Sequence, residues 1–199
     1  MFLKFAWVGV GLVWLCAVQM MFGAPDYVII DPGHGGFDRG GMPGQRIPEK
    51  GLALDTARRL RRVLAGTRVR PIMTRSSDVF VPLDVRTAIA NRYAGRKAVF
   101  VSIHYNAGER VGAYGIETYY NNARARPLAI DVERRVIKAM DSMDRGVWQR
   151  GFFVLRRNRL PAILVECGFL TNPDEARRAL DPLYRQRTAE AIARAILEY

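Results

Sequence analysis

Hydrophobic and polar positions along this chain follow two periods, one typical of strands and one typical of helices. Short runs of β-branched and apolar residues predict strands at residues 27–31, 69–74, 98–104, 116–120 and 162–166. Apolar positions recur at helical spacing in two sets, Ala53, Ala57, Leu60 and Leu64, and then Val85, Ile89 and Tyr93. Further helices are predicted over residues 127–143 and 183–197. The alternation predicts a single α/β domain with a mostly parallel, twisted sheet flanked by helices.

Two segments, residues 108–115 and 144–158, lack either period and are predicted to be loops. In an open α/β sheet, ligands bind beyond the carboxyl ends of the strands, where the chain turns into loops and helix amino termini. Functional residues are therefore expected at that edge of the sheet.

The first residues do not follow the pattern of the domain. Lys4 precedes an apolar stretch over residues 5–22, which only glycines and Gln19 interrupt. This pattern predicts a signal peptide or membrane anchor in residues 1–24 and an exported domain in residues 25–199. The exported domain would act in the periplasm or cell envelope, secreted or anchored through residues 5–22. The sequence leaves both cleavage and retention of the segment open.

The net charge of the chain is +12, and removal of residues 1–24, whose one charged side chain is Lys4, leaves +11. This charge favours an anionic partner, although Arg58, Arg59, Arg61 and Arg62 are better explained as a solvated helix face than as a binding patch. Nucleic acid is disfavoured as the partner, because the domain is predicted to be exported and has no recognisable motif for reading bases.

The two histidines of the chain both occur at carboxyl ends of predicted strands. His34 follows the strand at 27–31, and His104 ends the strand at 98–104, so both are expected at the same edge of the sheet. A single histidine in such a place is more often a structural hydrogen-bonding residue. Two histidines accompanied by acidic residues at the same edge favour a functional site instead.

Two glutamates are expected at the same edge. Glu49 follows a glycine- and proline-rich loop and begins the first helix, where a carboxylate is also favoured by the helix dipole alone. Glu166 ends a strongly apolar strand, where a carboxylate is costly unless a polar group or a metal receives it. Asp31 is either an acceptor that orients a metal ligand or a turn-forming residue before Pro32.

Two imidazoles and one carboxylate are the ligand set of a catalytic zinc site, in which water occupies the fourth position. His34, Glu49 and His104 are therefore predicted to bind one Zn²⁺ per chain, and Glu166 to act as the catalytic base that takes a proton from that water. Side chains alternate along a strand, so Cys167 is expected on the packing side as a small buried residue.

Four ordered motifs resemble the zinc-dependent N-acetylmuramoyl-L-alanine amidases of the Amidase_3 family. They are the segments around Asp31-Pro32-Gly33-His34-Gly35-Gly36, Glu49-Lys50, Ser102-Ile103-His104-Tyr105-Asn106 and Val165-Glu166-Cys167-Gly168-Phe169. The resemblance implies zinc ligation by His34, Glu49 and His104 and catalysis by Glu166. It also implies the substrate, peptidoglycan, and the bond cleaved, the amide between the lactyl group of N-acetylmuramic acid and L-alanine of the stem peptide.

Two other functions remain as alternatives, a zinc peptidase of the cell wall and a wall-binding module without catalysis. The ligand set alone does not exclude the peptidase, whereas the presence of Glu166 beside all three ligands disfavours the binding module. We expect a monomer, and the sequence does not identify an activator protein.

Overall fold

The computed structural model describes residues 23–42, 45–108 and 112–199. Residues 1–22, which carry nearly all of the predicted signal peptide or anchor, lie outside the described residues, as does part of the predicted loop at 108–115. Within the described ranges, no helix is both long and apolar enough to cross a bilayer.

A six-stranded sheet with the order β2-β1-β3-β6-β4-β5 forms the centre of the molecule. β1 pairs in parallel with β2 and β3, and β3 pairs in parallel with β6. β4 runs antiparallel to β6, and β5 is parallel to β4 at the edge. The predicted mostly parallel sheet is confirmed. The strands are β1 (Tyr27–Pro32), β2 (Arg70–Met73), β3 (Ala98–Asn106), β4 (Ile116–Tyr120), β5 (Asp144–Gln149) and β6 (Ala162–Phe169).

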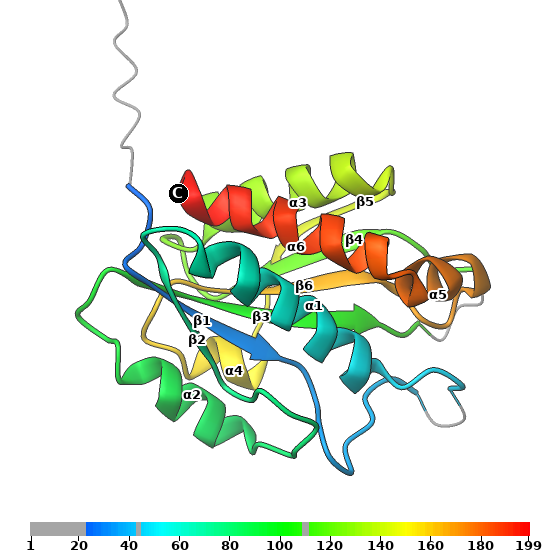
Figure 1. Cartoon of the computed structure of the whole chain (residues 1–199), viewed down its shortest axis with the longest axis horizontal. Coiled ribbons are helices and arrows are strands. Elements are labelled where there is room, and N and C mark those ends of the chain that lie inside the picture. The colour runs from blue at the N-terminus through cyan, green and yellow to red at the C-terminus, as the bar shows by residue number, and fades with distance from the viewer. Residues whose placement is uncertain (1–22, 43–44, 109–111) are drawn as a thin grey trace, which may run out of the picture.

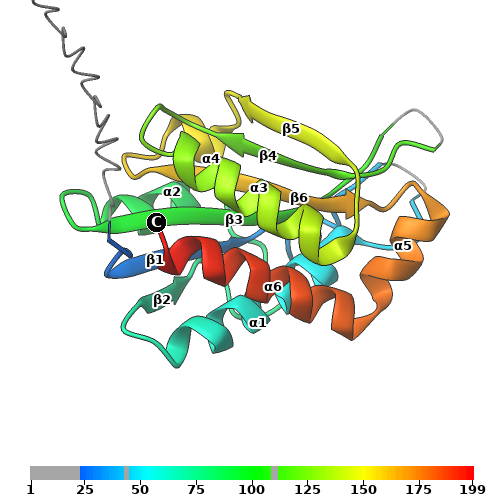
Figure 2. The same ribbon diagram turned by 90° about the horizontal axis from the view of Figure 1, so that it is seen from above.

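Helices cover both faces of this sheet. α1, α3 and α6 lie side by side on one face, and α2 and α4 lie on the other (Figures 1 and 2). The central strands are buried on both faces, which explains their continuous apolar runs. The helices are α1 (Glu49–Ala65), α2 (Leu83–Asn91), α3 (Arg126–Met140), α4 (Phe153–Arg156), α5 (Pro173–Leu180) and α6 (Pro182–Leu197).

The segment 144–158 was predicted to be a loop, and this prediction is wrong. It contains the edge strand β5 and the short helix α4. β5 is largely polar and only partly buried, so its sequence lacks the alternation that marks a strand. Pairing with β4 supplies the backbone hydrogen bonds that hold it. α5 also lacked a prediction, because half of its eight residues are charged.

The apolar face predicted for α2 is confirmed in part. Ile89 and Tyr93 pack against the hydrophobic cluster on this side of the sheet, whereas Val85 is 42% exposed. Arg86, next to Val85, is buried, and its guanidinium reaches across to the carboxylate of Asp31, with Nη1 2.9 Å from Oδ1. A buried ion pair thus adds to the apolar contacts that hold α2 against the sheet.

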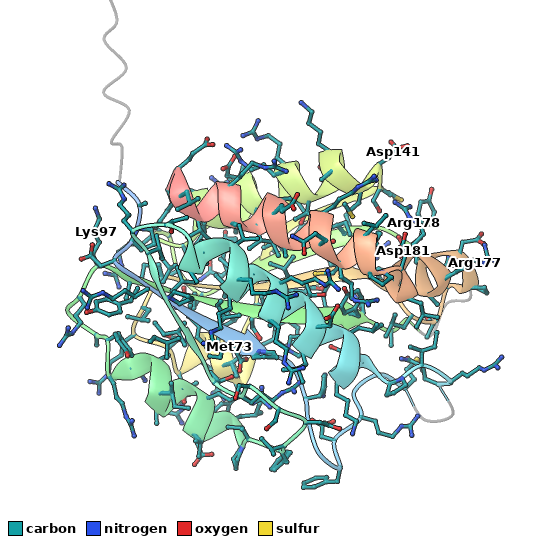
Figure 3. The ribbon with its side chains drawn as sticks, in the orientation of Figure 1. Met73, Lys97, Asp141, Arg177, Arg178 and Asp181 are labelled. Atoms are coloured by element: carbon teal, nitrogen blue, oxygen red, sulfur yellow. The ribbon has the colours of Figure 1, made fainter. Side chains whose placement is uncertain are left out.

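Basic side chains extend from opposite ends of the molecule, as Figure 3 shows for Lys97 at one end and for Arg177 and Arg178 near α5 at the other. The positive charge is thus spread over the surface rather than confined to the outer face of α1.

Glu133 is a buried carboxyl group between α3 and the sheet. Thr118 Oγ1 donates to its Oε2 at 2.6 Å, while Oε1 is buried without a hydrogen-bond partner among the described residues. Burial, only partly offset by the Thr118 hydrogen bond, raises the pKa of Glu133 to about 8. The folded state therefore favours the protonated form of this side chain.

We predict that Glu133→Gln removes a pH-dependent loss of stability. Between an unfolded pKa of 4.5 and a folded pKa of about 8, the folded protein binds more protons than the unfolded chain, so stability falls as pH rises. At about pH 8 the variant should gain on the order of 2 kcal/mol over the wild type, and little at about pH 5. Urea unfolding measures this difference, with Glu190→Gln on α6 as the control. Equal gains at both pH values would contradict the prediction.

Candidate metal centre

Three side chains from distant parts of the sequence converge at the carboxyl edge of the sheet. His34 directly follows β1, Glu49 is the first residue of α1, and His104 lies near the end of β3. One ligand atom from each lies within 4.8 Å of the others. The two imidazole rings are 5.0 Å apart between centroids and nearly perpendicular, at 80°. The structure thus brings together the three residues that the sequence predicted to share a metal ion.

The carboxylate of Glu49 lies between the two imidazoles. Its Oε2 is 3.0 Å from His34 Nε2, and its Oε1 is 2.7 Å from His104 Nδ1. Oε1 also accepts the backbone N–H of Tyr105 at 3.0 Å. Burial alone would raise the pKa of Glu49, but the charge and hydrogen bond of His104, followed by those of His34, outweigh it and lower the pKa to about 2. Glu49 is therefore an ionised, buried carboxylate.

His34 is oriented by a second carboxylate. Its Nδ1 is 2.8 Å from Asp38 Oδ2, so that Nδ1 donates to Asp38 and leaves Nε2 directed at Glu49. Burial would lower the pKa of His34, but hydrogen bonds and negative charge from Glu49 and Asp38 raise it. A carboxylate behind the imidazole is the arrangement that fixes the tautomer of a metal-binding histidine.

Two glycines bring the backbone close to these side chains, whose donors suit a metal ion. A Cβ on Gly33 would lie 2.4 Å from His104 Cε1, and a Cβ on Gly40 would lie 2.6 Å from His34 Cδ2 and 2.7 Å from Glu49 Oε2. Two imidazole nitrogens that face one carboxylate require positive charge between them, either protons or a cation. The donor set of two nitrogens and one carboxylate is suited to a divalent transition metal.

Glu166 lies beside this group on the neighbouring strand. It is the register partner of His104 in β3 and of Glu117 in β4, so the three side chains point to the same face of the sheet. Its Oε2 is buried and has no hydrogen-bond partner in the described part of the chain. Burial and the negative charges of Glu49 and Glu117 raise the pKa of Glu166 well above its usual range. A buried carboxylate oxygen without a partner, next to the three ligand candidates, is available to a bound water or substrate.

Glu117 on β4 and Arg145 on β5 lie beyond Glu166, on the side away from His104. Arg145 Nε is 3.5 Å from Glu117 Oε2, and its guanidinium lies 4.7 Å above the ring of Phe169. Asn106 donates a hydrogen bond to the other oxygen of Glu117. Glu117 does not stand out as a site residue in the sequence, since an acidic residue in a half-polar strand is common. Its register pairing with Glu166 shows its place.

A buried arginine supports the loop that carries His34. Arg86 donates to the backbone oxygens of Pro32 and His34, at 2.6 and 2.7 Å, and to Asp31. His34 has a positive φ of 59°, which is unusual for a residue other than glycine. The hydrogen bond from Arg86 to the backbone oxygen of His34 helps to hold this angle. No hydrogen bond joins Asp31 to either imidazole within the described residues. The suggestion that Asp31 orients a ligand directly is therefore wrong, and Asp38 has that position.

Cys167 faces away from the metal centre, as its alternation with Glu166 predicts. It is fully buried in the hydrophobic cluster beneath α1, α3 and α6. Burial raises the pKa of its thiol well above the usual range. The thiol is therefore a packing group rather than a metal ligand.

Comparisons with known proteins agree on one family. A sequence profile described as N-acetylmuramoyl-L-alanine amidase, Amidase_3, matches residues 28–198. The chain is 33% identical over 177 residues to N-acetylmuramoyl-L-alanine amidase LytC of Bacillus subtilis; the match covers 86% of this chain and 35% of LytC. The chain thus spans about a third of the length of that relative.

Two solved structures show the same fold along nearly their whole length. An N-acetylmuramoyl-L-alanine amidase from Clostridium difficile 630 is 36% identical with a TM-score of 0.82, and the match covers 89% of this chain and 97% of that one. AmiC2 of Nostoc punctiforme is 38% identical with a TM-score of 0.80, over 87% of this chain and 96% of that one.

We predict that Gly33→Ala weakens metal binding without unfolding the domain. Gly33 does not have a positive φ, so alanine fits its backbone, but the new methyl group would displace the His104 imidazole. The affinity for Zn²⁺, measured by calorimetric titration, should fall about tenfold or more. Gly51→Ala in α1 is the matched control, because a Cβ there meets no described atom within 4 Å. It should keep the metal affinity and stabilise α1 by about 0.5–1 kcal/mol. Unchanged affinity in Gly33→Ala would contradict the placement of His104 in the site.

Proposed function

This chain belongs to the N-acetylmuramoyl-L-alanine amidase family Amidase_3, and we propose that it is a zinc-dependent peptidoglycan hydrolase. The bond cleaved is the amide between the lactyl group of N-acetylmuramic acid and L-alanine of the stem peptide. The observation that carries the proposal is the group of His34, Glu49 and His104, with Glu166 in register beside it, in a chain that matches the family along residues 28–198.

The ligand set supports zinc as the metal. His34 and His104 offer imidazole nitrogens and Glu49 offers an ionised carboxylate, a combination of donors that zinc accepts in catalytic sites. When bound, zinc supplies Lewis acidity, which makes a water molecule acidic and polarises the carbonyl of the scissile amide. The protein holds the ligands in place through Asp38 behind His34 and through the backbone N–H of Tyr105 on Glu49.

Glu166 is the proposed general base. Its Oε2 is unoccupied by hydrogen bonds from the described residues, and its side chain shares the face of the sheet on which His104 lies. As an ionised carboxylate it can accept a proton from the attacking water and then donate it to the leaving amino group of L-alanine. Burial and the negative charges of Glu49 and Glu117 raise the pKa of Glu166, whereas a divalent metal held by the three ligands would lower it toward the ionised form that the first step needs.

The cell envelope is the proposed place of action. The substrate lies outside the cytoplasm, and the sequence predicts export of residues 25–199, either as a secreted domain or anchored through residues 5–22. Peptidoglycan is the proposed partner, and the positive charge of the chain, +12, complements the carboxylates of its stem peptides. The protein is proposed to act as a monomer, without nucleic acid as a partner.

The products of digestion test the bond that is cleaved. We predict that digestion of purified peptidoglycan releases intact stem peptides with free L-alanine amino termini and leaves the glycan strands uncut, as mass spectrometry would show. Removal of the metal with a chelator should abolish this release, and added Zn²⁺ should restore it. Fragments cut within the stem peptide would instead assign a zinc peptidase, and full activity after verified metal loss would refute the metal-dependent mechanism.

We predict that Glu166→Gln lowers kcat by about 100-fold or more while Zn²⁺ and peptidoglycan binding are retained, because the amide keeps the shape of the side chain but cannot carry the proton. The measurements are hydrolysis of peptidoglycan, metal content and sedimentation with the wall. Glu190→Gln on α6 is the control for a glutamate away from the site. Undiminished hydrolysis in Glu166→Gln would remove the base from the mechanism, and an absence of hydrolysis in the wild type would favour a wall-binding module.

A further inference from the structure

Two exposed phenylalanines lie beside the metal centre. Phe37 is 80% exposed and Phe80 is 42% exposed, and their rings stack with centroids 4.3 Å apart and planes 30° from parallel. Both line a hollow of about 750 Å³ that also contains His34. Large apolar side chains exposed together at the entrance of a polar site are a mark of ligand binding rather than of packing.

The loops that carry the two rings are fastened to each other. Gly36 N–H donates to Asp78 Oδ1 at 2.9 Å, and Lys50 Nζ donates to both Gly36 O and Asp78 Oδ2 at 2.7 Å. A Cβ on Gly36 would lie 2.7 Å from the backbone nitrogen of Phe80, so the two loops touch through their backbones. The aromatic pair is therefore presented on a cross-linked support, which lowers the entropic cost of binding a ligand.

Buried Arg75 ties this support to the metal centre. It donates to Gly33 O at 2.6 Å and to Lys50 O at 2.9 Å, beside His34 and Glu49 respectively, and to Ser77 O at 3.1 Å on the second loop. The positions of the rings and of the ligand candidates are thus set by the same hydrogen-bond network.

The two sides of the metal centre differ in chemistry. Phe37 and Phe80 flank it on the side of β1 and β2, and Arg145 flanks it on the side of β4 and β5. The substrate of the proposed function also has two unlike halves, since the scissile amide joins an uncharged sugar to a peptide that carries carboxylates. The halves must therefore extend in different directions from the metal.

We propose that the stacked pair of Phe37 and Phe80 is a glycan subsite, on which a pyranose ring of the peptidoglycan strand stacks. The inference rests on the proposed function and deepens it. The C–H groups on one face of a pyranose ring are weakly positive and complement the negative face of an aromatic ring. Asp38, Arg39 and Gln45 line the same hollow and offer donors and acceptors to sugar hydroxyl and acetamido groups.

The charges near the pair are largely balanced, which suits an uncharged sugar. Asp78 is paired with Lys50, Asp38 lies 2.8 Å from His34 Nδ1, and Arg39 lines the same hollow. Asp84 adjoins the exposed stretch of Val79, Phe80 and Leu83 and would repel an anionic membrane surface.

Three substitutions at Phe37 test the subsite in the metal-loaded, full-length protein. The probe is a β-1,4-linked tetramer of N-acetylglucosamine, a peptide-free analogue of the glycan, and the readout is its Kd. Phe37→Ala and Phe37→Leu should each weaken binding about tenfold, whereas Phe37→Trp should retain it, because stacking needs a flat ring. Phe152→Ala is the matched control, an aromatic residue 43% exposed whose ring lies against Tyr119 of β4. Equal binding by wild type and Phe37→Ala, or full binding by Phe37→Leu, would overturn the proposal.

A second measurement separates this proposal from the proposed function. Phe37→Ala should raise KM about tenfold on uncross-linked glycan strands bearing stem peptides, and much less on a D-lactoyl stem peptide, which keeps the amide and lacks the sugar. Equal losses on both substrates would overturn the glycan subsite while leaving the amidase intact. If the wild type cleaves neither substrate, the proposed function fails, and the tetramer titration still decides whether the rings bind a sugar. Binding to phosphatidylglycerol vesicles that Phe37→Leu preserves would identify a membrane contact instead.

Discussion

The carboxylate of Glu49 imposes the main constraint on this site. It is buried, it is ionised, and both of its oxygens face an imidazole nitrogen, at 2.7 and 3.0 Å. A buried carboxylate without positive charge beside it costs on the order of several kcal/mol, so protons or a cation must share the space with it. This requirement explains the raised pKa of His34 and the fit of the site to a metal ion with the same three ligands.

The surrounding structure holds these charges with buried arginines. Arg86 joins Asp31 to the backbone of His34, and Arg75 joins the backbone of Gly33 to that of Lys50 in the first turn of α1. Each guanidinium can donate up to five hydrogen bonds in fixed directions, so one side chain can fasten several loop carbonyls. The glycine-rich loop after β1 thereby becomes a rigid part of the site, and it can present both a metal ligand and exposed aromatic rings.

Hydrophobic patterning predicted most of the fold, and it failed where tertiary contacts replace apolar burial. The five predicted strands occur within a few residues of their expected ends, because most of them are apolar enough to be buried on their own account, β2 at the edge being only half-buried. β5 forms because β4 offers a free edge, although its own residues are largely polar and exposed. Along α2 and just beyond it, Ile89 and Tyr93 pack as their spacing predicted, and the buried ion pair between Arg86 and Asp31 adds a contact that no helical period contains.

The sequence by itself determined which residue types were available for a metal centre and at which edge of the sheet they would lie. With only two histidines, each at the end of a parallel strand, it predicted that His34, Glu49 and His104 would meet. Tertiary structure decided the rest: that Asp38 rather than Asp31 supports His34, that Glu117 stands beside Glu166, and that Phe37 stacks on Phe80. Each of these contacts depends on how a loop closes or how two strands align, and such distances are set by packing between segments that the local sequence pattern does not relate.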